Sequence, residues 1–368
     1  MSDLQTRITE FIESTQAAAC VDSINSVILV CKSLTGVQMN PWIVEISRGQ
    51  LVESSSVGHG IVINADGETL LSFGDLKRET FPRSAVKWVQ ALELVLSGAA
   101  DAFGLSDEHL AIACASHNGE QEHVTLVDQW LNQMGLDIHD LECGVTLPFT
   151  ESMRLKLSHD HVTANQLHHC CSGKHTGMLS VCKHVGWQTD GYTGYNHPLQ
   201  AKIREHMSLI FGVDAKTLDY ASDGCSVPTY ALPLDVMALG FAKLGAERFS
   251  DELNAAARKL RKAQAIAPFM VAGSNRLDTQ LLEAGRGRLQ VKMGAEGVYL
   301  GAIADREIGF ALKCEDGSLR GQEALVVELL SAIGEGDLVN RLPESSRSPM
   351  ITTAQDEAVG RISVRRSQ

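Results

Sequence analysis

Short runs of β-forming residues lie near both ends of this chain, and a long, mainly helical stretch separates them. The first group extends from Trp42 to Phe73 and contains Asp66-Gly67 between two apolar runs, which is a strong hairpin signal. The second group consists of three apolar runs within residues 289–313. Because strands must pair, the two groups predict one antiparallel sheet that both ends of the chain complete, with a helical subdomain inserted. The expected fold class is α+β, not an alternating Rossmann pattern.

The segments between the two groups have the apolar spacing of helices. Pro82 opens a long helical pattern that Gly98 ends, and the run from Leu110 to Cys114 is predicted as a buried strand ending near Ser116. Further helices are predicted over residues 123–134, 174–185, 198–211, 233–244, 248–263 and 322–333. We expect an N-terminal extension of unknown role over residues 1–40, a single domain with a helical insert over 41–335, and a loose polar tail over 336–368.

The composition is that of a soluble protein whose substrate is small. Of the 368 residues 44% are hydrophobic, and with a formal net charge of −13 the chain lacks the basic patches that nucleic-acid binding needs. No secretory signal is evident in the first residues, and no apolar run is long enough to span a membrane. Nine cysteines without an export signal favour free thiols or metal ligands over disulfides. We expect a cytoplasmic protein with no nucleic-acid or membrane partner.

The densest group of reactive side chains is the segment 168–175, which places three histidines, two thiols and a lysine within eight positions. Cysteine and histidine bind zinc and similar metals, and a thiolate can also act as a nucleophile. The apolar spacing that follows predicts a helix ended by Gly186. The group therefore lies at a helix N-terminus, where unpaired backbone amides favour a thiolate over a thiol.

A metal site can be built from this segment and one distant cysteine. Cys171, Lys174 and Cys225 are the candidate ligands, and Asp223 or His175 can orient a ligand or a bound water. Lysine is a rare ligand because it must first lose a proton. The residue types alone therefore favour His169 or His175 over Lys174 as the third ligand.

Two further lysines are candidates for chemistry. Ser84 and Lys87 lie three residues apart in a predicted helix, so a lysine neutralised by burial can act as base for a serine nucleophile. The ordinary explanation is a helix cap followed by a solvated lysine, and a second such spacing, from Ser180 to Lys183, shows how easily the pattern arises. Lys292 ends a predicted strand, where side chains often project into a cleft, although an exposed edge lysine is commoner.

Five of these stretches, in this order, resemble the Rhizobium-etli-type L-asparaginases of the asparaginase II family. The resemblance runs from about Trp42 to about Leu330, and residues 1–40 and the tail have no counterpart in it. The run from Cys171 to Leu179 is the most specific. The matching runs are Arg83 to Lys87, Cys114 to His117, Cys171 to Leu179, Asp223 to Thr229 and Lys292 to Ala295.

The resemblance implies a fold like that of serine β-lactamases and glutaminases, a homodimer, and hydrolysis of L-asparagine to L-aspartate and ammonia. It also implies two Ser-Lys tandems, Ser84 with Lys87 and Ser116 with Lys292. Ser84, deprotonated by Lys87, would attack the side-chain amide, while Ser116 and Lys292 relay protons or stabilise the oxyanion. The reverse assignment, with Ser116 as the nucleophile, stays open.

The resemblance further implies a zinc site made by Cys171, Lys174 and Cys225, in place of the histidine ligand that the residue types favour. Asp223 and His175 match residues around that metal. Zinc can polarise or anchor the substrate, or it can hold the two cysteine loops together. Arg83 is a candidate for binding the substrate α-carboxylate, because a guanidinium offers two parallel hydrogen bonds.

Two alternatives remain at this stage. The first is a glutaminase or another serine-dependent acyl hydrolase, because one methylene in a pocket changes binding by only ~1 to 3 kcal/mol. The second is a non-catalytic thiol sensor in which Cys171 and Cys225 bind zinc and the Ser-Lys spacings are incidental.

Overall fold

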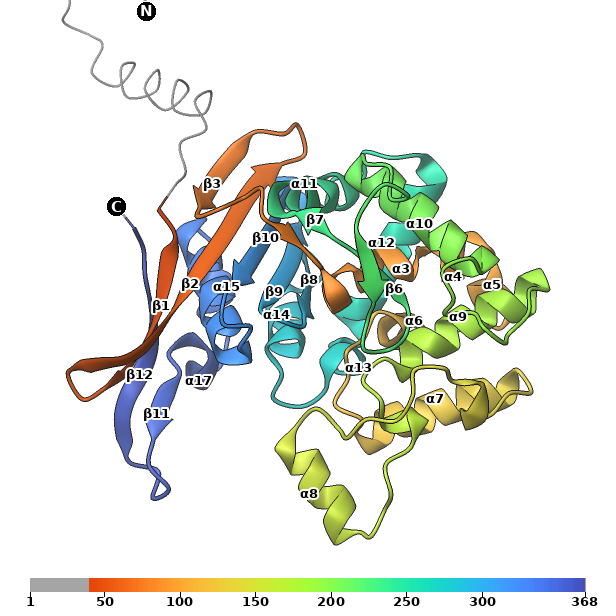
Figure 1. The fold of residues 1–368 in the computed structure, drawn as a ribbon, viewed down its shortest axis with the longest axis horizontal. Coiled ribbons are helices and arrows are strands. Elements are labelled where there is room, and N and C mark those ends of the chain that lie inside the picture. Colours follow the sequence, from red (N-terminus) through yellow and green to blue (C-terminus); the bar gives the residue numbers. More distant parts are fainter. Residues whose placement is uncertain (1–39, 368) are drawn as a thin grey trace, which may run out of the picture. The chain divides into compact units, whose positions relative to one another are not determined.

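An antiparallel sheet that both ends of the chain build is the centre of the described part, residues 40–367 of the computed structural model (Figure 1). The predicted extension over residues 1–40 falls outside this part except for its last residue. The sheet confirms the predicted α+β class. Its strands, in spatial order, are β11 (Met350–Thr352), β12 (Ala358–Arg365), β1 (Trp42–Arg48), β2 (Leu51–Asn64), β10 (Ile308–Cys314), β9 (Val298–Ile303) and β8 (Leu289–Gly294), and β3 (Thr69–Phe73) pairs with β2.

Strand β2 connects the N-terminal and C-terminal halves of the sheet. Its first half pairs with β1, and its second half pairs with β10, with Gly58 opposite Cys314. Helix α11 (Leu234–Gly245) covers one face, where Gly309 of β10 lies too close to α11 for any side chain. Helix α15 (Leu319–Ala332) covers the other face, with Leu325 against Gly58. The central strands are therefore buried on both faces.

The chain between β3 and β8 forms the helical part, on the right in Figure 1. Most of its helices pack on one another, whereas α11 lies on the sheet and α14 packs against β8, and its β-segments are short pairs. In chain order these elements are β4 (Glu79–Thr80), η1 (Arg83–Val86), α3 (Lys87–Gln90), α4 (Leu92–Leu96), α5 (Ala99–Ala102), α6 (Asp107–Ala113), α7 (Gln121–Gln133), η2 (Ile138–Asp140), α8 (Glu151–His159), η3 (Gln166–His168), α9 (Ser172–Val185), α10 (Pro198–Phe211), β5 (Tyr220–Ser222), β6 (Pro228–Tyr230), β7 (Leu232–Pro233), α11, α12 (Asp251–Ile266), α13 (Pro268–Ala272) and α14 (Leu277–Gly285).

Most predicted helices are confirmed within a few residues. Helices α7, α9, α10, α11, α12 and α15 occupy the expected places, and Gly186 ends α9 with a φ of 83°, a left-handed conformation that glycine adopts without strain. Helix α15 begins where the Ser318 hydroxyl accepts a hydrogen bond from Gly321 N–H at 3.2 Å.

One local prediction holds in part and one is wrong. The segment expected as a long helix from Pro82 to Gly98 is helical from Arg83 to Leu96, but it is divided into η1, α3 and α4, with a backbone at Val86 that departs from helical geometry. The strand expected from Leu110 to Cys114 is part of helix α6. Every residue from Leu110 to Ala113 is buried, so the apolar run carries no helical periodicity from which the prediction could have been corrected.

The expectation of a loose tail is also wrong. After the short helices α16 (Gly336–Val339) and α17 (Glu344–Arg347), the chain returns as β11 and β12. Strand β12 pairs antiparallel with β1, with Val364 opposite Val44. The tail is polar because it lies on the rim of the sheet, where its side chains are only partly buried.

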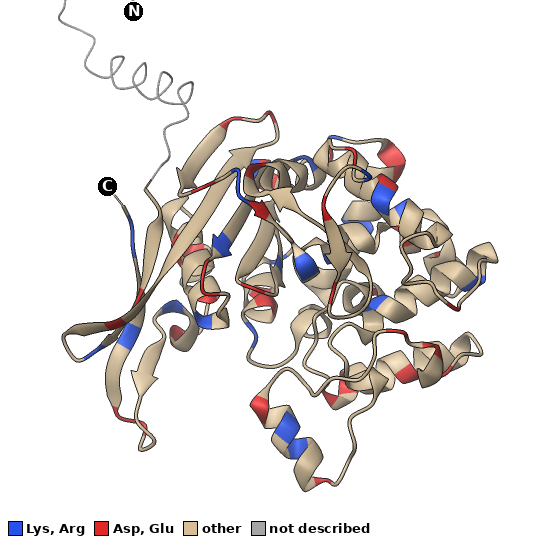
Figure 2. Ribbon diagram, in the orientation of Figure 1, with Lys and Arg blue, Asp and Glu red and all other residues tan. Residues whose placement is uncertain are grey.

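The surface of the described part carries charges of both signs. Basic and acidic residues are interspersed over helices and strands alike (Figure 2). Among the described residues, no helix combines the length and apolar character that crossing a bilayer would need.

Candidate active site

Ser84 and Lys87 lie on a short helical turn beside the end of strand β8. Ser84 belongs to η1, and in a 3-10 helix residues three apart lie on the same side, so Ser84 and Lys87 face one way. Gly294, the last residue of β8, lies so close to the carbonyl oxygen of Pro82 that no side chain would fit there. This close packing brings the turn next to the strand that carries Lys292.

The Lys87 amine is fully buried and is surrounded by uncharged polar groups and a thiol. Its Nζ lies 2.9 Å from Ser116 Oγ and 3.0 Å from Cys171 Sγ, and it also donates to the carbonyl oxygen of Ala115. Within residues 40–367 it forms no ion pair. Lys87 is therefore within reach of the Ser116 hydroxyl for the exchange of a proton.

The hydroxyl that Lys87 contacts is that of Ser116, whereas the sequence spacing paired it with Ser84. Ser84 is half-buried, and within the described residues its hydroxyl forms no hydrogen bond. Ser116 is only 5% exposed. The structure thus brings Lys87 and Ser116 into contact and leaves Ser84 as the more accessible hydroxyl on the same side of the turn.

A hydrogen-bonded loop fixes the position of Ser116. The Ser116 N–H donates to the carbonyl oxygen of Val271 at 2.9 Å. His117 accepts from Gly119 N–H at Nδ1 (3.1 Å), so its proton is on Nε2, which lies 2.9 Å from Ser172 Oγ. Burial and nearby positive groups keep the pKa of His117 well below its usual value. His117 is therefore a neutral residue that supports the loop.

Lys292 is held by a carboxylate that the sequence analysis did not identify. Its Nζ lies 2.7 Å from Asp278 Oδ2 and 3.0 Å from the carbonyl oxygen of Met293, and the Lys292 and Asp278 side chains are 1% and 2% exposed. No direct hydrogen bond joins Lys292 to Ser116 within the described part. Burial lowers the pKa of Lys292 to about 8, although Asp278 opposes this shift.

Asp278 has three kinds of donor around its carboxylate. The Tyr299 hydroxyl donates to Oδ1 at 2.5 Å, and the Met293 N–H, on the free edge of β8, lies 3.2 Å from Oδ2. Burial acts to raise the pKa of Asp278, but Lys292, Arg276 and these donors outweigh it, so the pKa is lowered. Asp278 is ionised, and nothing in its local sequence, Leu277-Asp278-Thr279, distinguishes it from a surface helix residue.

The three candidate zinc ligands gather at the N-terminus of α9. Cys171 is the N-cap residue of α9, Lys174 Nζ lies 3.0 Å from Cys225 Sγ, and the Cys171 thiol adjoins that of Cys225. His175 lies beside them, and its Nε2 is buried with no hydrogen-bond partner among the described atoms, while Nδ1 contacts the Tyr192 hydroxyl at 2.6 Å. Two thiols and an imidazole nitrogen without a partner among the described atoms fit a zinc ion, and Lys174 would have to lose its proton to join them.

The histidines that the residue types favoured as ligands lie within the same cluster. The donor atoms of His169, Cys170 and Cys171 are within 4.8 Å of one another. His169 Nδ1 accepts a hydrogen bond from the Cys171 N–H at 3.0 Å. Burial lowers the pKa of His175 to about 4, so its imidazole is neutral. The arrangement therefore brings the expected ligands together without deciding between lysine and histidine.

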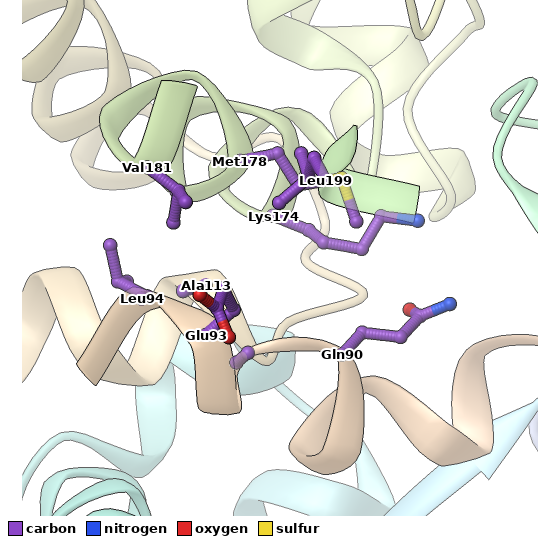
Figure 3. Close-up of a pocket in the computed structure, with 10 residues that line it drawn as sticks. Gln90, Glu93, Leu94, Ala113, Lys174, Met178, Val181 and Leu199 are labelled. Carbon is purple, nitrogen blue, oxygen red and sulfur yellow. The ribbon is translucent and has the colours of Figure 1, made fainter. Parts of the chain in front are cut away.

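The stem of Lys174 lies along a small apolar cavity of about 10 Å³ between α9 and α3 (Figure 3). Met178 and Leu199 line it, and Gln90 lies below it in the figure with an Oε1 that has no hydrogen-bond partner among residues 40–367. The space is at most that of one water molecule, so an amino-acid substrate does not bind there. Burial acts to lower the pKa of Lys174, but Cys225, Cys171 and Asp223 outweigh it and raise the pKa.

Arg83 and Asp223 form an ion pair next to these groups. Arg83 Nε donates to Asp223 Oδ1 at 2.5 Å, with side chains that are 26% and 13% exposed. Asp223 also accepts from Gly224 N–H at 2.8 Å. Burial raises the pKa of Asp223, but Lys174 and Arg83 outweigh it, so the carboxylate is ionised. The two Nη groups of Arg83 make no hydrogen bond within the described residues.

Comparison with known proteins gives one strong match. A profile of the family described as L-asparaginase II matches residues 44–364, which includes β11 and all but the last residue of β12. No curated protein matches the sequence significantly. A β-lactamase from Mycobacterium bovis is 11% identical with a TM-score of 0.33, covering 78% of this chain and 95% of that one. A candidate β-lactamase from Bacteroides dorei is 12% identical with a TM-score of 0.34, covering 82% and 91%. Both structural similarities are too weak to support a conclusion.

Proposed function

Because the chain belongs to the L-asparaginase II family, a group of amidohydrolases, we propose that it hydrolyses L-asparagine to L-aspartate and ammonia through a serine nucleophile. The observation that carries this proposal is the buried contact between Lys87 Nζ and Ser116 Oγ at 2.9 Å. Lys87 itself lies one helical turn after Ser84. A buried amine beside a hydroxyl is the arrangement that activates serine without a histidine.

Ser84 is the proposed nucleophile because it is the more exposed of the two hydroxyls. Its Oγ forms a bond to the side-chain amide carbon of asparagine, and its proton passes to Lys87, directly or through Ser116. The protonated amine then returns a proton to the departing nitrogen, the C–N bond breaks, and ammonia leaves. Water hydrolyses the resulting ester to aspartate and regenerates Ser84.

Lys292 supplies positive charge where the oxyanion develops. A single donor aimed at an oxyanion is worth on the order of 3 kcal/mol in other enzymes. Arg83 and Asp223 carry the charges that would pair with the α-carboxylate and α-ammonium of an amino acid. The two Nη groups of Arg83, which form no hydrogen bond within the described part of the chain, leave two donors for the carboxylate.

Zinc is part of the proposal as a group held by Cys171 and Cys225, with Lys174 or His175. It would supply positive charge and tie the N-terminus of α9 to the Cys225 loop. Metal analysis of the purified protein and of Cys225→Ser tests this, together with thermal unfolding. We expect the variant to bind less zinc and to unfold at lower temperature. Equal zinc content in both proteins would contradict the site.

Ammonia release from L-asparagine and L-glutamine tests the activity. We expect release from asparagine by the wild type and none by Ser84→Ala. Mass spectrometry of acid-quenched samples should reveal a covalent adduct with the mass of an aspartyl group in the wild type alone. Ser180→Ala, which alters the second Ser-x-x-Lys spacing, is the matched control and should remain active. Absence of release from asparagine, with zinc supplied and the fold intact, would contradict the assignment.

A further inference from the structure

The buried pair formed by Lys292 and Asp278 carries an inference that deepens the proposed function and rests on it. A lysine that served as a general base would have neutral or positive neighbours that favour loss of its proton. Lys292 instead has the Asp278 carboxylate 2.7 Å from its amine, with both side chains almost completely buried.

The carboxylate is itself fixed, so the ion pair cannot easily rearrange. Tyr299 and the Met293 N–H donate to it, while the Met293 carbonyl oxygen accepts from Lys292. These donors stabilise the negative charge of Asp278. Transfer of the lysine proton to Asp278 would remove that charge and weaken the hydrogen bonds, so the ionised pair is favoured. The surrounding sheet edge and α14 hold the pair in one geometry.

We propose that Asp278 is a positioning residue that keeps Lys292 protonated and directed at the reacting centre, so that Lys292 acts as a cationic hydrogen-bond donor and not as a base. Lys87, which contacts the Ser116 hydroxyl, keeps the role of base that the proposed function gives it. The two tandems that the resemblance implies therefore have separate roles.

Other charged and titratable groups around the pair do not replace Asp278. The positive charges of Lys87 and Arg276 disfavour the protonated form of Lys292. The other carboxyl group nearby is that of Glu323, and burial raises its pKa to about 7. These groups, from the elements packed around Lys292, are Lys87, Arg276, Cys114, Cys170, Tyr299 and Glu323.

The direct test is the protonation of Lys292 in the substrate-free protein. Isotope-labelled lysine can be followed by NMR as a function of pH, and Lys292→Ala assigns its signal. We expect the wild-type signal to titrate near pH 8. In Asp278→Asn the midpoint should fall by roughly 1 to 3 pH units, because the opposite charge is removed. Tyr299→Phe, which keeps the carboxylate, is the matched control and should shift it less.

Kinetics provide the second readout. The alkaline limb of the kcat profile should move to lower pH in Asp278→Asn by the same amount as the NMR midpoint. An unchanged midpoint and an unchanged limb, in a variant that still folds, would overturn the inference. If Asp278→Asn does not fold, a wild-type Lys292 already neutral at pH 7 would overturn it equally. A wild type that turns over no asparagine would overturn the proposed function, while the NMR titration would still test the coupling.

Discussion

The two buried lysines of the site lie in surroundings of opposite kind. Lys87 contacts a hydroxyl, a carbonyl oxygen and a thiol, whereas Lys292 contacts an ionised carboxylate. Both are almost completely removed from water, so burial alone does not distinguish them. The difference teaches that two amines buried to the same depth can be held by different partners, a hydroxyl and a thiol for Lys87 and a carboxylate for Lys292, and the partner defines what each amine is placed to do.

The strongest way to break this comparison is to remove the Lys87 amine. Lys87→Met should reduce kcat by about 100- to 10,000-fold, because proton transfer to and from the nucleophile is lost. The change is measured by ammonia release from asparagine. Lys183→Ala removes the exposed lysine of the other Ser-x-x-Lys spacing and should leave kcat unchanged. A Lys87→Met enzyme within about tenfold of the wild type would show that Lys87 is not the base.

The second test addresses the stability of the pair. Asp278→Ala leaves the Lys292 charge buried without a partner, and should lower the free energy of unfolding by roughly 3 to 5 kcal/mol. Urea unfolding measures this loss. The double variant Asp278→Ala/Lys292→Met should recover a large part of it, because no buried charge remains. If the losses of the two single variants simply add, the residues are not coupled.

The third test uses pH. Folding lowers the pKa of Lys292 from 10.5 to about 8, so between these values the unfolded chain holds a proton that the folded one has lost. The free energy of unfolding should therefore rise with pH across this window, by roughly 3 kcal/mol in total relative to Lys292→Met. Below pH 8 both states are protonated and the difference between the two proteins should be constant. If the difference in the free energy of unfolding between the wild type and Lys292→Met does not change from pH 7 to 10.5, the lowered pKa of Lys292 is contradicted.

The smallest expected effect sharpens the description of Asp278. Tyr299→Phe removes one donor to a charged acceptor and should cost roughly 1.5 to 3 kcal/mol of stability. Thermal or urea unfolding measures it, and kcat at neutral pH should change little because the ion pair remains. A large loss of activity with unchanged stability would mean that Tyr299 acts in the reaction directly.

The sequence predicted the α+β class because its two groups of β-forming runs are separated by a mainly helical stretch, so the strands of one group must pair with those of the other. The candidate site could be predicted from the sequence only in part. Ser84 and Lys87 could be paired by spacing, but the groups that Lys87 contacts, Ser116 and Cys171, come from distant segments that only the tertiary fold brings together. Asp278 carried no signal at all, because its role depends on the free edge of β8, which local sequence does not define.

The failed local predictions have a common physical cause. Leu110 to Ala113 are buried on every side, so their helix has no polar face to reveal its period. The tail was taken as loose because it is polar, yet β12 pairs with β1 through its backbone, and backbone hydrogen bonds need no apolar side chains. In both cases the neighbouring elements, and not the residues themselves, determined the outcome.

The pairing of β2 with β10 also has a consequence for synthesis. Residues 58–64 pair with residues 308–314, so the ribosome must synthesise almost the whole chain before this part of the sheet can form. Until then β2 exposes an apolar edge that invites pairing with other chains. Such non-local pairing slows folding. We therefore expect nascent chains that end before β10 to depend on chaperones, and the site to form late, as the last strands are released.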